Sequence, residues 1–584
     1  MKVSNHKKNM IKCLIAWFLV VGLTVTSCGS TSPQDFSAWT KELFVQELSA
    51  NTLNLHYTLK EPERFGITEY EPTIGDFSKK SRKQSISALK EVKRKLSGMK
   101  KRKLSGEDEL TYETLMNYTQ HALTLSEFEL YEDPLLPNGG TATQLPLLLA
   151  EYAFDDAEDI SDYLTMLSQL DGYFDQVLAF EQEKADAGLF MSDALCQKTI
   201  TELEHFLTDP EECYLHRTFL RKLEAMPDEA AKADTIGEHL RILSEEVMPA
   251  YRKLIAGLTG MMGYGRNESG LCYYEKGKEY YQALVQANLG CEDSMDALFT
   301  QISDTRTKDL AACANLKAAN EDLAEKCQSY SLSYTKDEEI LARLREAIRT
   351  DFPPLPKVSC AVEYVDPSMA EYLAPAFYIT APCDAYTDNT IYINSAASYP
   401  DLSYFVTLAH EAVPGHLYQT VMSYEYGITP LRTLLNYPGY TEGWATYVEF
   451  LSYEYADLEK PVAQMLKHSQ LASLSLYAAS DIGIHYYGWN RKELLSFWSE
   501  FGVTDPAIVE EIEELVLSNP GNYLSYYVGC VKLMELRDGL MEKYGDDFSL
   551  KTFHEALLRI GPTGFSVLKE RIGEYYEVSC KETG

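Results

Sequence analysis

The chain has 584 residues, with 88 acidic against 53 basic side chains and a formal net charge of −35 at pH 7. This length can bury one large helical body or two or three subdomains. An acidic balance of this size repels a phosphate backbone, so nucleic acid is excluded as an expected partner. Charge alone identifies neither a ligand nor an oligomeric state.

The first 27 residues are typical of an export signal: four lysines precede an apolar run over 13–23, and small residues follow it. The Val-Thr-Ser-Cys-Gly segment at 25–29 resembles a bacterial lipobox, in which the cysteine is lipidated and becomes the mature N-terminus. We therefore expect Cys28 to anchor an exported protein to the extracytoplasmic side of the cell membrane, with a spacer over 28–35. A plain secretory signal with an incidental cysteine is the alternative.

Helical periodicity dominates the N-terminal part, from residue 36 to about 350. Apolar residues recur at three- and four-residue spacing, as in Tyr163, Leu167 and Leu170, and such stripes face a core. Within this part, a basic island at 93–103 is typical of a solvated helix end. Contact of the island with anionic lipid headgroups is the alternative interpretation.

Short β-rich segments interrupt this pattern between residues 353 and 395. They cover 358–365, 377–381 and 390–394, separated by Pro, Asp and Asn, and they predict a small sheet. From residue 399 the helical periodicity returns and continues almost to the end.

These patterns predict a mostly α fold with a small sheet just before the helix that starts near residue 399. We expect residues 36–350 and 351–584 to pack as one body, with the chemistry in the second part.

The sequence His-Glu-Ala-Val-Pro-Gly-His at 410–416 suits a catalytic zinc site. Such a site takes about three His or Asp/Glu ligands, keeps one position open for water, and has a carboxylate nearby. His410 and His416 are candidate ligands, and Glu411 is the candidate base. On a regular helix a six-residue interval would leave the two rings roughly 120° apart. We therefore predict a bulged helix, distorted at Pro414-Gly415.

A second helix is expected from Tyr440, after a turn at Pro438-Gly439, and it carries Glu-Gly-Trp-Ala-Thr-Tyr-Val-Glu at 442–449. Glu442 is the candidate third ligand of a single zinc ion. Glu449 lies two turns further on the same helix face, where an acid can orient a ligating imidazole.

The two motifs together resemble the bacterial "domain of unknown function 885" family, which the resemblance places among the gluzincin metallopeptidases. The resemblance extends over most of the mature chain. It implies His410 and His416 as zinc ligands, Glu442 as the third ligand and Glu411 as the general base. It also implies a helical body around a deep cleft.

Further roles are implied by the resemblance alone. A donor to the oxyanion is expected from Tyr526 or His554. His485 is expected to line the cleft, with a hydrogen-bonded structural histidine as the alternative. Thr390 to Asn394 is the expected edge strand, on which a peptide substrate would lie as an added strand.

The leading hypothesis is a zinc-dependent metallopeptidase in which Glu411 activates a zinc-bound water, with exopeptidase or endopeptidase action left open. Two alternatives remain. One is a non-catalytic, peptide-binding surface lipoprotein on a zincin fold, and the other is a zinc hydrolase of a different amide or ester.

Overall fold

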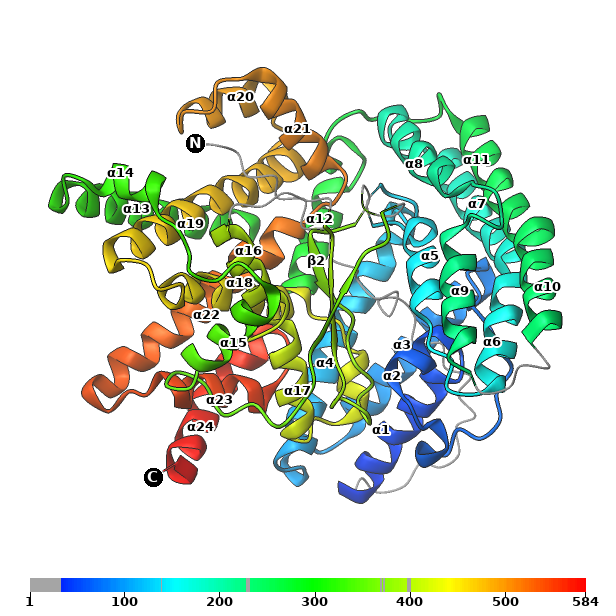
Figure 1. The fold of residues 1–584 in the computed structure, drawn as a ribbon, viewed down its shortest axis with the longest axis horizontal. Helices are drawn as coiled ribbons and strands as arrows, with labels where there is room; N and C mark the ends of the chain where they lie inside the picture. The colour runs from blue at the N-terminus through cyan, green and yellow to red at the C-terminus, as the bar shows by residue number, and fades with distance from the viewer. Residues whose placement is uncertain are drawn as a thin grey trace.

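The computed structural model describes residues 33–583, apart from 138, 227–231, 368–369, 371–372 and 396–400. The expected export signal, Cys28 and most of the spacer lie outside the described residues. The described residues are mostly helical and include one three-stranded sheet (Figure 1), so the expected mostly α fold with a small sheet is confirmed. No helix among them is long and apolar enough to cross a membrane.

Four helices at the start of the chain form the base of the molecule: α1 (Pro33–Leu48), α2 (Thr52–Thr58), α3 (Lys79–Gly98) and α4 (Glu107–Leu125). Seven helices follow, which we call the wing: α5 (Thr141–Glu151), α6 (Ala157–Ser168), α7 (Leu170–Ala187), α8 (Asp193–Phe206), α9 (Tyr214–Glu224), α10 (Lys232–Ile242) and α11 (Met248–Met261).

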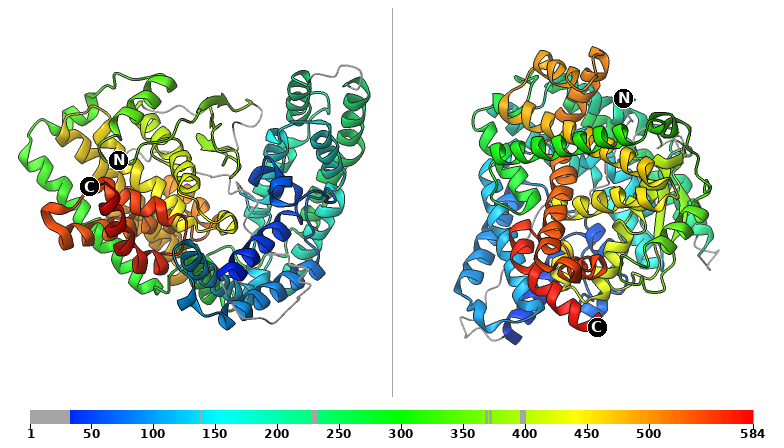
Figure 2. Two further views of the ribbon diagram at one scale, coloured as in Figure 1. Left: turned by 90° about the horizontal axis from the view of Figure 1, so that it is seen from below. Right: turned by 90° about the vertical axis from the view of Figure 1, so that its left-hand side faces the viewer.

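The remaining helices form the body. Those before the sheet are α12 (Gly277–Leu289), α13 (Met295–Ala319), α14 (Leu323–Ser329) and α15 (Asp337–Ala347). Those after it are α16 (Asp401–Glu411), α17 (His416–Glu425), α18 (Pro438–Ser452), α19 (Lys460–Ile482), α20 (Arg491–Ser499), α21 (Pro506–Leu517), α22 (Asn522–Tyr544), α23 (Leu550–Ile560) and α24 (Phe565–Thr583). In Figure 2 the wing and helices α13–α24 form two arms that the base joins.

The sheet lies between these two arms. Its strands are β1 (Ala361–Tyr364), β2 (Ala376–Tyr378) and β3 (Thr390–Ile393), in the order β1-β3-β2. β3 pairs with β1 in parallel and with β2 antiparallel. The expectation that 390–394 is an edge strand is therefore wrong: β3 is the middle strand, and its neighbours on both sides already use its backbone groups. β2 is an edge strand.

Successive side chains of a strand point to opposite faces of the sheet, so this one sheet contributes side chains to two hydrophobic cores. Ile391 packs in the core of the body and base, whereas Phe377 packs in the core of the wing. Glu151 of the wing strengthens this link, because its carboxylate accepts hydrogen bonds of 2.8 Å from the hydroxyls of both Tyr392 in β3 and Tyr214 in α9. The sheet is thus held between wing and body by packing on both faces.

Helices α18 and α22 pack with their backbones in contact. A Cβ atom added at Gly443 would lie 2.6 Å from the carbonyl carbon of Gly529, and one added at Gly529 would overlap the carbonyl oxygen of Gly439. Glycine at these positions lets the two helices approach more closely than any side chain would allow.

This close approach predicts that Gly529→Ala destabilises the protein by about 1–3 kcal/mol, because the added methyl group has no space and must push the helices apart. Gly539→Ala on the same helix is the matched control, since nothing lies within 4 Å of its added Cβ. The control is expected to be neutral or slightly stabilising. Thermal unfolding of the two variants compares them, and equal melting temperatures would contradict the packing argument.

Candidate metal centre

The first helix of the site is interrupted between the two histidines. α16 ends at Glu411 and α17 begins at His416. The backbone N–H of Tyr418 donates to the carbonyl of Ala412 at 3.1 Å, which spans six residues where a regular helix spans four. Two residues are therefore looped out. The predicted distortion at Pro414-Gly415 is confirmed, although it is a full break between two helices and not a bulge within one.

Two contacts fix the loop. The backbone of Gly415 lies so close to the preceding turn that a Cβ there would overlap the carbonyl oxygen of His410. The indole N–H of Trp444, a fully buried residue of α18, donates to the carbonyl of Pro414 at 3.0 Å. Trp444 thus connects the loop to the next helix. The sequence motif contains Trp444 but does not show what the residue touches.

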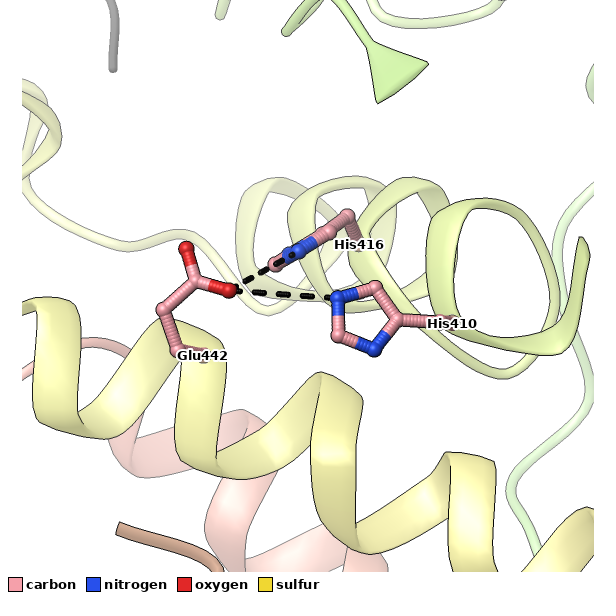
Figure 3. A group of neighbouring side chains, drawn as sticks. All are labelled: His410, His416 and Glu442. Atoms are coloured by element: carbon pink, nitrogen blue, oxygen red, sulfur yellow. Dashed lines mark ion pairs between the residues drawn. The ribbon is translucent and has the colours of Figure 1, made fainter. Parts of the chain in front are cut away.

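His410, His416 and Glu442 come together as predicted, from the ends of α16, α17 and α18 (Figure 3). Glu442 Oε2 lies 3.8 Å from His410 Nε2 and 3.6 Å from His416 Nε2. The three potential ligand atoms all lie within 4.8 Å of one another, and all three residues are buried.

Glu449 lies behind His410, as its position on α18 predicts. His410 Nδ1–H donates to Glu449 Oε2 at 3.0 Å. This bond fixes the tautomer and directs the lone pair of Nε2 toward Glu442.

Glu442 remains charged despite its burial. Burial by itself raises the pKa of this carboxyl, but His416, His410 and the hydroxyl of Tyr526 together hold the pKa below its ordinary value. Its Oε2 atom is buried and makes no hydrogen bond to the described residues.

The donor set fits zinc. Two imidazole nitrogens and one carboxylate oxygen are a common set at catalytic zinc sites, and tetrahedral zinc at about 2.1 Å from each donor separates the donors by roughly 3.4 Å. The separations of 3.6 and 3.8 Å from Glu442 are close to that value. A buried carboxylate oxygen without a hydrogen bond is the kind of atom that a cation satisfies.

Glu411 and Tyr526 complete the centre. Glu411 Oε1 lies 3.9 Å from His410 Nε2. The ring of Tyr526, from α22, is stacked on the imidazole of His410 with centroids 6.1 Å apart, and its hydroxyl hydrogen-bonds Glu442. Burial and the charges of Glu442 and Glu411 raise the pKa of Tyr526 well above its usual range, so the hydroxyl keeps its proton.

His554 does not reach the centre, and its predicted role as a donor to the oxyanion is wrong. Its Nδ1–H donates to the carbonyl of Asp351 at 2.6 Å, and its Nε2 accepts from the hydroxyl of Tyr447 at 2.9 Å. Burial lowers its pKa to about 3, so the ring is neutral. With both nitrogens used inside the core, His554 supports the structure beneath α18.

His485 does not line the cleft, so that prediction is also wrong. Its Nδ1 accepts from the backbone N–H of Leu271 at 3.2 Å, and its Nε2–H donates to the carbonyl of Val516 at 3.1 Å. The side chain is 1 % exposed, and burial lowers its pKa to about 4. It joins three parts of the core.

A cavity of about 210 Å³ lies beside the centre, lined by Glu411, His416 and Glu442. Phe377 and Tyr378 of the edge strand β2 also line it, so the sheet reaches the metal site through β2 and not through β3. A larger cavity of about 410 Å³ adjoins it along the 436–438 segment, where the base and the wing meet the body.

The sequence matches the family described as bacterial protein of unknown function (DUF885) over residues 62–572. Two solved structures, each described as a "putative lipoprotein", share the fold. The one from Colwellia psychrerythraea is 20% identical with a TM-score of 0.80, covering 94% of this chain and 100% of its own. The one from Shewanella oneidensis, of unknown function, is 14% identical with a TM-score of 0.62, covering 91% and 99%. Among curated proteins there is no match.

The contact between Glu449 and His410 predicts that Glu449→Gln weakens zinc binding about 10- to 100-fold, because a neutral amide polarises the imidazole less and no longer fixes its tautomer. Glu542→Gln is the matched control, an exposed glutamate on α22. Competition with a chromogenic chelator measures both affinities. Equal affinity of the two variants for zinc would show that Glu449 has no effect on the centre.

Proposed function

We propose that this chain, which belongs to the DUF885 family of bacterial proteins, is a zinc-dependent metallopeptidase of the gluzincin type. The observation that carries the proposal is the convergence of His410, His416 and Glu442, with Glu411 beside them, at a cavity. Three ligands and a separate carboxylate are the parts that metal-assisted hydrolysis of an amide requires.

One zinc ion would be held by His410, His416 and Glu442, and when bound it supplies a Lewis acid that polarises a carbonyl group and acidifies water. Glu411 takes the proton of the attacking water and returns it to the leaving amine. Its side chain is buried and lines the cavity, so it reaches the reacting groups while bulk water is largely kept away.

Tyr526 is the donor to the oxyanion in this proposal. Its hydroxyl keeps its proton, as its pKa is raised, and the ring is held against His410. Rotation of the hydroxyl away from Glu442 allows it to donate to the carbonyl oxygen of the substrate as negative charge develops there.

The edge strand β2 supports a peptide as the substrate. Among the described residues β2 pairs only with β3, and we infer that an extended peptide adds as a further strand on its second edge. Since Phe377 and Tyr378 line the same cavity as Glu411, a peptide on this edge passes the metal ligands.

Export and a lipid anchor at Cys28 complete the proposal and rest on the lipobox-like segment at 25–29. A surface location would give the enzyme access to peptides outside the cytoplasm.

Glu411→Gln is expected to lower kcat/KM for peptide hydrolysis by about 10²–10⁴-fold while zinc content stays the same, because the amide cannot accept the proton of water. Mass spectrometry of a peptide mixture, combined with metal analysis, measures both. Glu542→Gln serves as the control. Parent-level hydrolysis by the Glu411 variant, or by protein stripped of metal, would exclude the proposed mechanism.

Tyr526→Phe is expected to lower kcat by about 10²–10³-fold with little change in KM, since the lost hydroxyl acts mainly in the transition state. The aromatic ring that stacks on His410 is retained. Tyr264→Phe, at an exposed position, is the control. Steady-state kinetics separates the two constants, and an unchanged kcat would remove Tyr526 from the mechanism.

A further inference from the structure

The cavity beside the metal centre continues along one face of α17. His416, Gln419 and Ser423 all line it, and residues at these intervals lie on the same side of a helix. With a rise of about 1.5 Å per residue, the seven-residue interval from His416 to Ser423 spans roughly 10 Å. The cavity thus has a metal end at His416 and a distal end at Ser423.

Three hydrogen-bonding groups around this cavity have no partner among the residues that the structure describes. Gln419 Nε2, Ser423 Oγ and Arg432 Nε are buried and make no hydrogen bond within the described part of the chain. The side chains are only 3 %, 3 % and 0 % exposed. Leaving such buried groups unpaired costs free energy, so their presence around one cavity indicates a ligand that pairs with them.

Arg432 and Ser423 face a common space. A Cβ atom added at Gly561 would lie 3.7 Å from Ser423 Oγ and 3.8 Å from Arg432 Nη2. The guanidinium of Arg432 is fixed there: Nη1 donates to Glu107 at 3.0 Å, and Nη2 donates to the carbonyls of Pro562 and Ile560. Within the described residues, Nε is the guanidinium nitrogen without an acceptor.

The charged and hydrogen-bonding groups that line the cavity indicate which kind of ligand its distal end binds. Among the described residues that line the cavity, Arg432 is the only lysine or arginine, and the only carboxylates are Glu411 and Glu442 at the metal end. Glu107 forms an ion pair with Arg432 but does not line the cavity. Gln419 Nε2 and Arg432 Nε can only donate, and a hydroxyl can donate as well, so the three groups suit an acceptor. A carboxylate can accept hydrogen bonds from such donors, whereas an ammonium group cannot.

We propose that the distal end of the cavity binds the C-terminal carboxylate of the substrate, so that the enzyme is a carboxypeptidase that releases a short C-terminal fragment. This inference rests on the proposed peptidase function. In the reaction the C–N bond breaks, the oxygen of water joins the carbonyl carbon, and the proton passes to the released amine. The substrate is therefore a peptide with a free carboxyl end.

The dimensions of the cavity limit the fragment. An extended peptide spans about 3.3–3.6 Å per residue, so roughly 10 Å accommodates about one to three residues between the scissile bond and the carboxylate. The volume of about 210 Å³ is below the roughly 300–1,000 Å³ of sites for drug-sized ligands, which also favours a short fragment.

The test compares two N-acetylated hexapeptides of the same sequence, one ending in a free carboxylate and the other in an amide. The zinc-loaded protein is expected to release one to three residues from the free acid, identified by mass spectrometry. The amide is expected to react with a kcat/KM at least about tenfold lower, because charge-assisted hydrogen bonds to the carboxylate are lost.

The Gln419→Glu variant tests the same contact from the side of the protein. It places a negative charge among the donors with little change in shape, and it is expected to lower kcat/KM for the free acid at least about tenfold and to reduce the preference for acid over amide. Gln197→Glu adds the same charge at an exposed position of α8 and is expected to leave both values unchanged. Ser423→Ala is a second, milder variant, expected to reduce the preference severalfold even if the Gln419 variant does not fold.

The outcomes separate the two proposals. Equal rates on the acid and the amide, cleavage in the interior of long peptides, or a requirement for a free N-terminus would overturn the carboxylate site and leave the peptidase function in place. If no peptide is hydrolysed by the zinc-loaded protein, the proposed function fails and the carboxylate site fails with it.

Discussion

Two imidazoles six residues apart can face one ion only if the helix between them leaves its regular path, and the structure around the site depends on this constraint. The bond from Tyr418 to Ala412 resumes the helix after two extra residues. Gly415 leaves room for the carbonyl of His410, and Trp444 holds the carbonyl of Pro414 from the neighbouring helix. The position of His416 is therefore a property of α16, α17 and α18 together and not of one helix.

Helix α18, whose Trp444 holds the loop, also supplies Glu442 and Glu449 to the site. The packing of this helix therefore determines where the two negative charges lie. Glu442 precedes Gly443, whose contact with Gly529 brings α22 and its Tyr526 against the site. Glu449 lies two turns along α18 and meets the other nitrogen of His410. Several carboxylates in one buried region are costly without compensation. A cation bound at the candidate centre, as proposed, would offset their charge.

The sequence could predict residues whose role follows from local spacing. The histidines, Glu442 and Glu449 belong to two short motifs, and helical intervals placed Glu449 on the face of Glu442. Local spacing could not predict the roles of His485 and His554, because their hydrogen-bond partners Val516 and Asp351 are distant in sequence. Strand order failed for the same reason: the composition of 390–394 indicates a strand but cannot show that two other segments pair with it.

Gln419 and Ser423 show how a site escapes motif analysis although its geometry is simple. Neither residue is unusual on a helix, and only the fold brings Arg432 to the same cavity. Yet α17 carries both the candidate ligand His416 and two of these donors, so the rise of a single helix sets the distance between the proposed metal centre and the proposed carboxylate site. A rigid helix does not change length as loops move. The number of residues released would therefore be fixed by α17 itself.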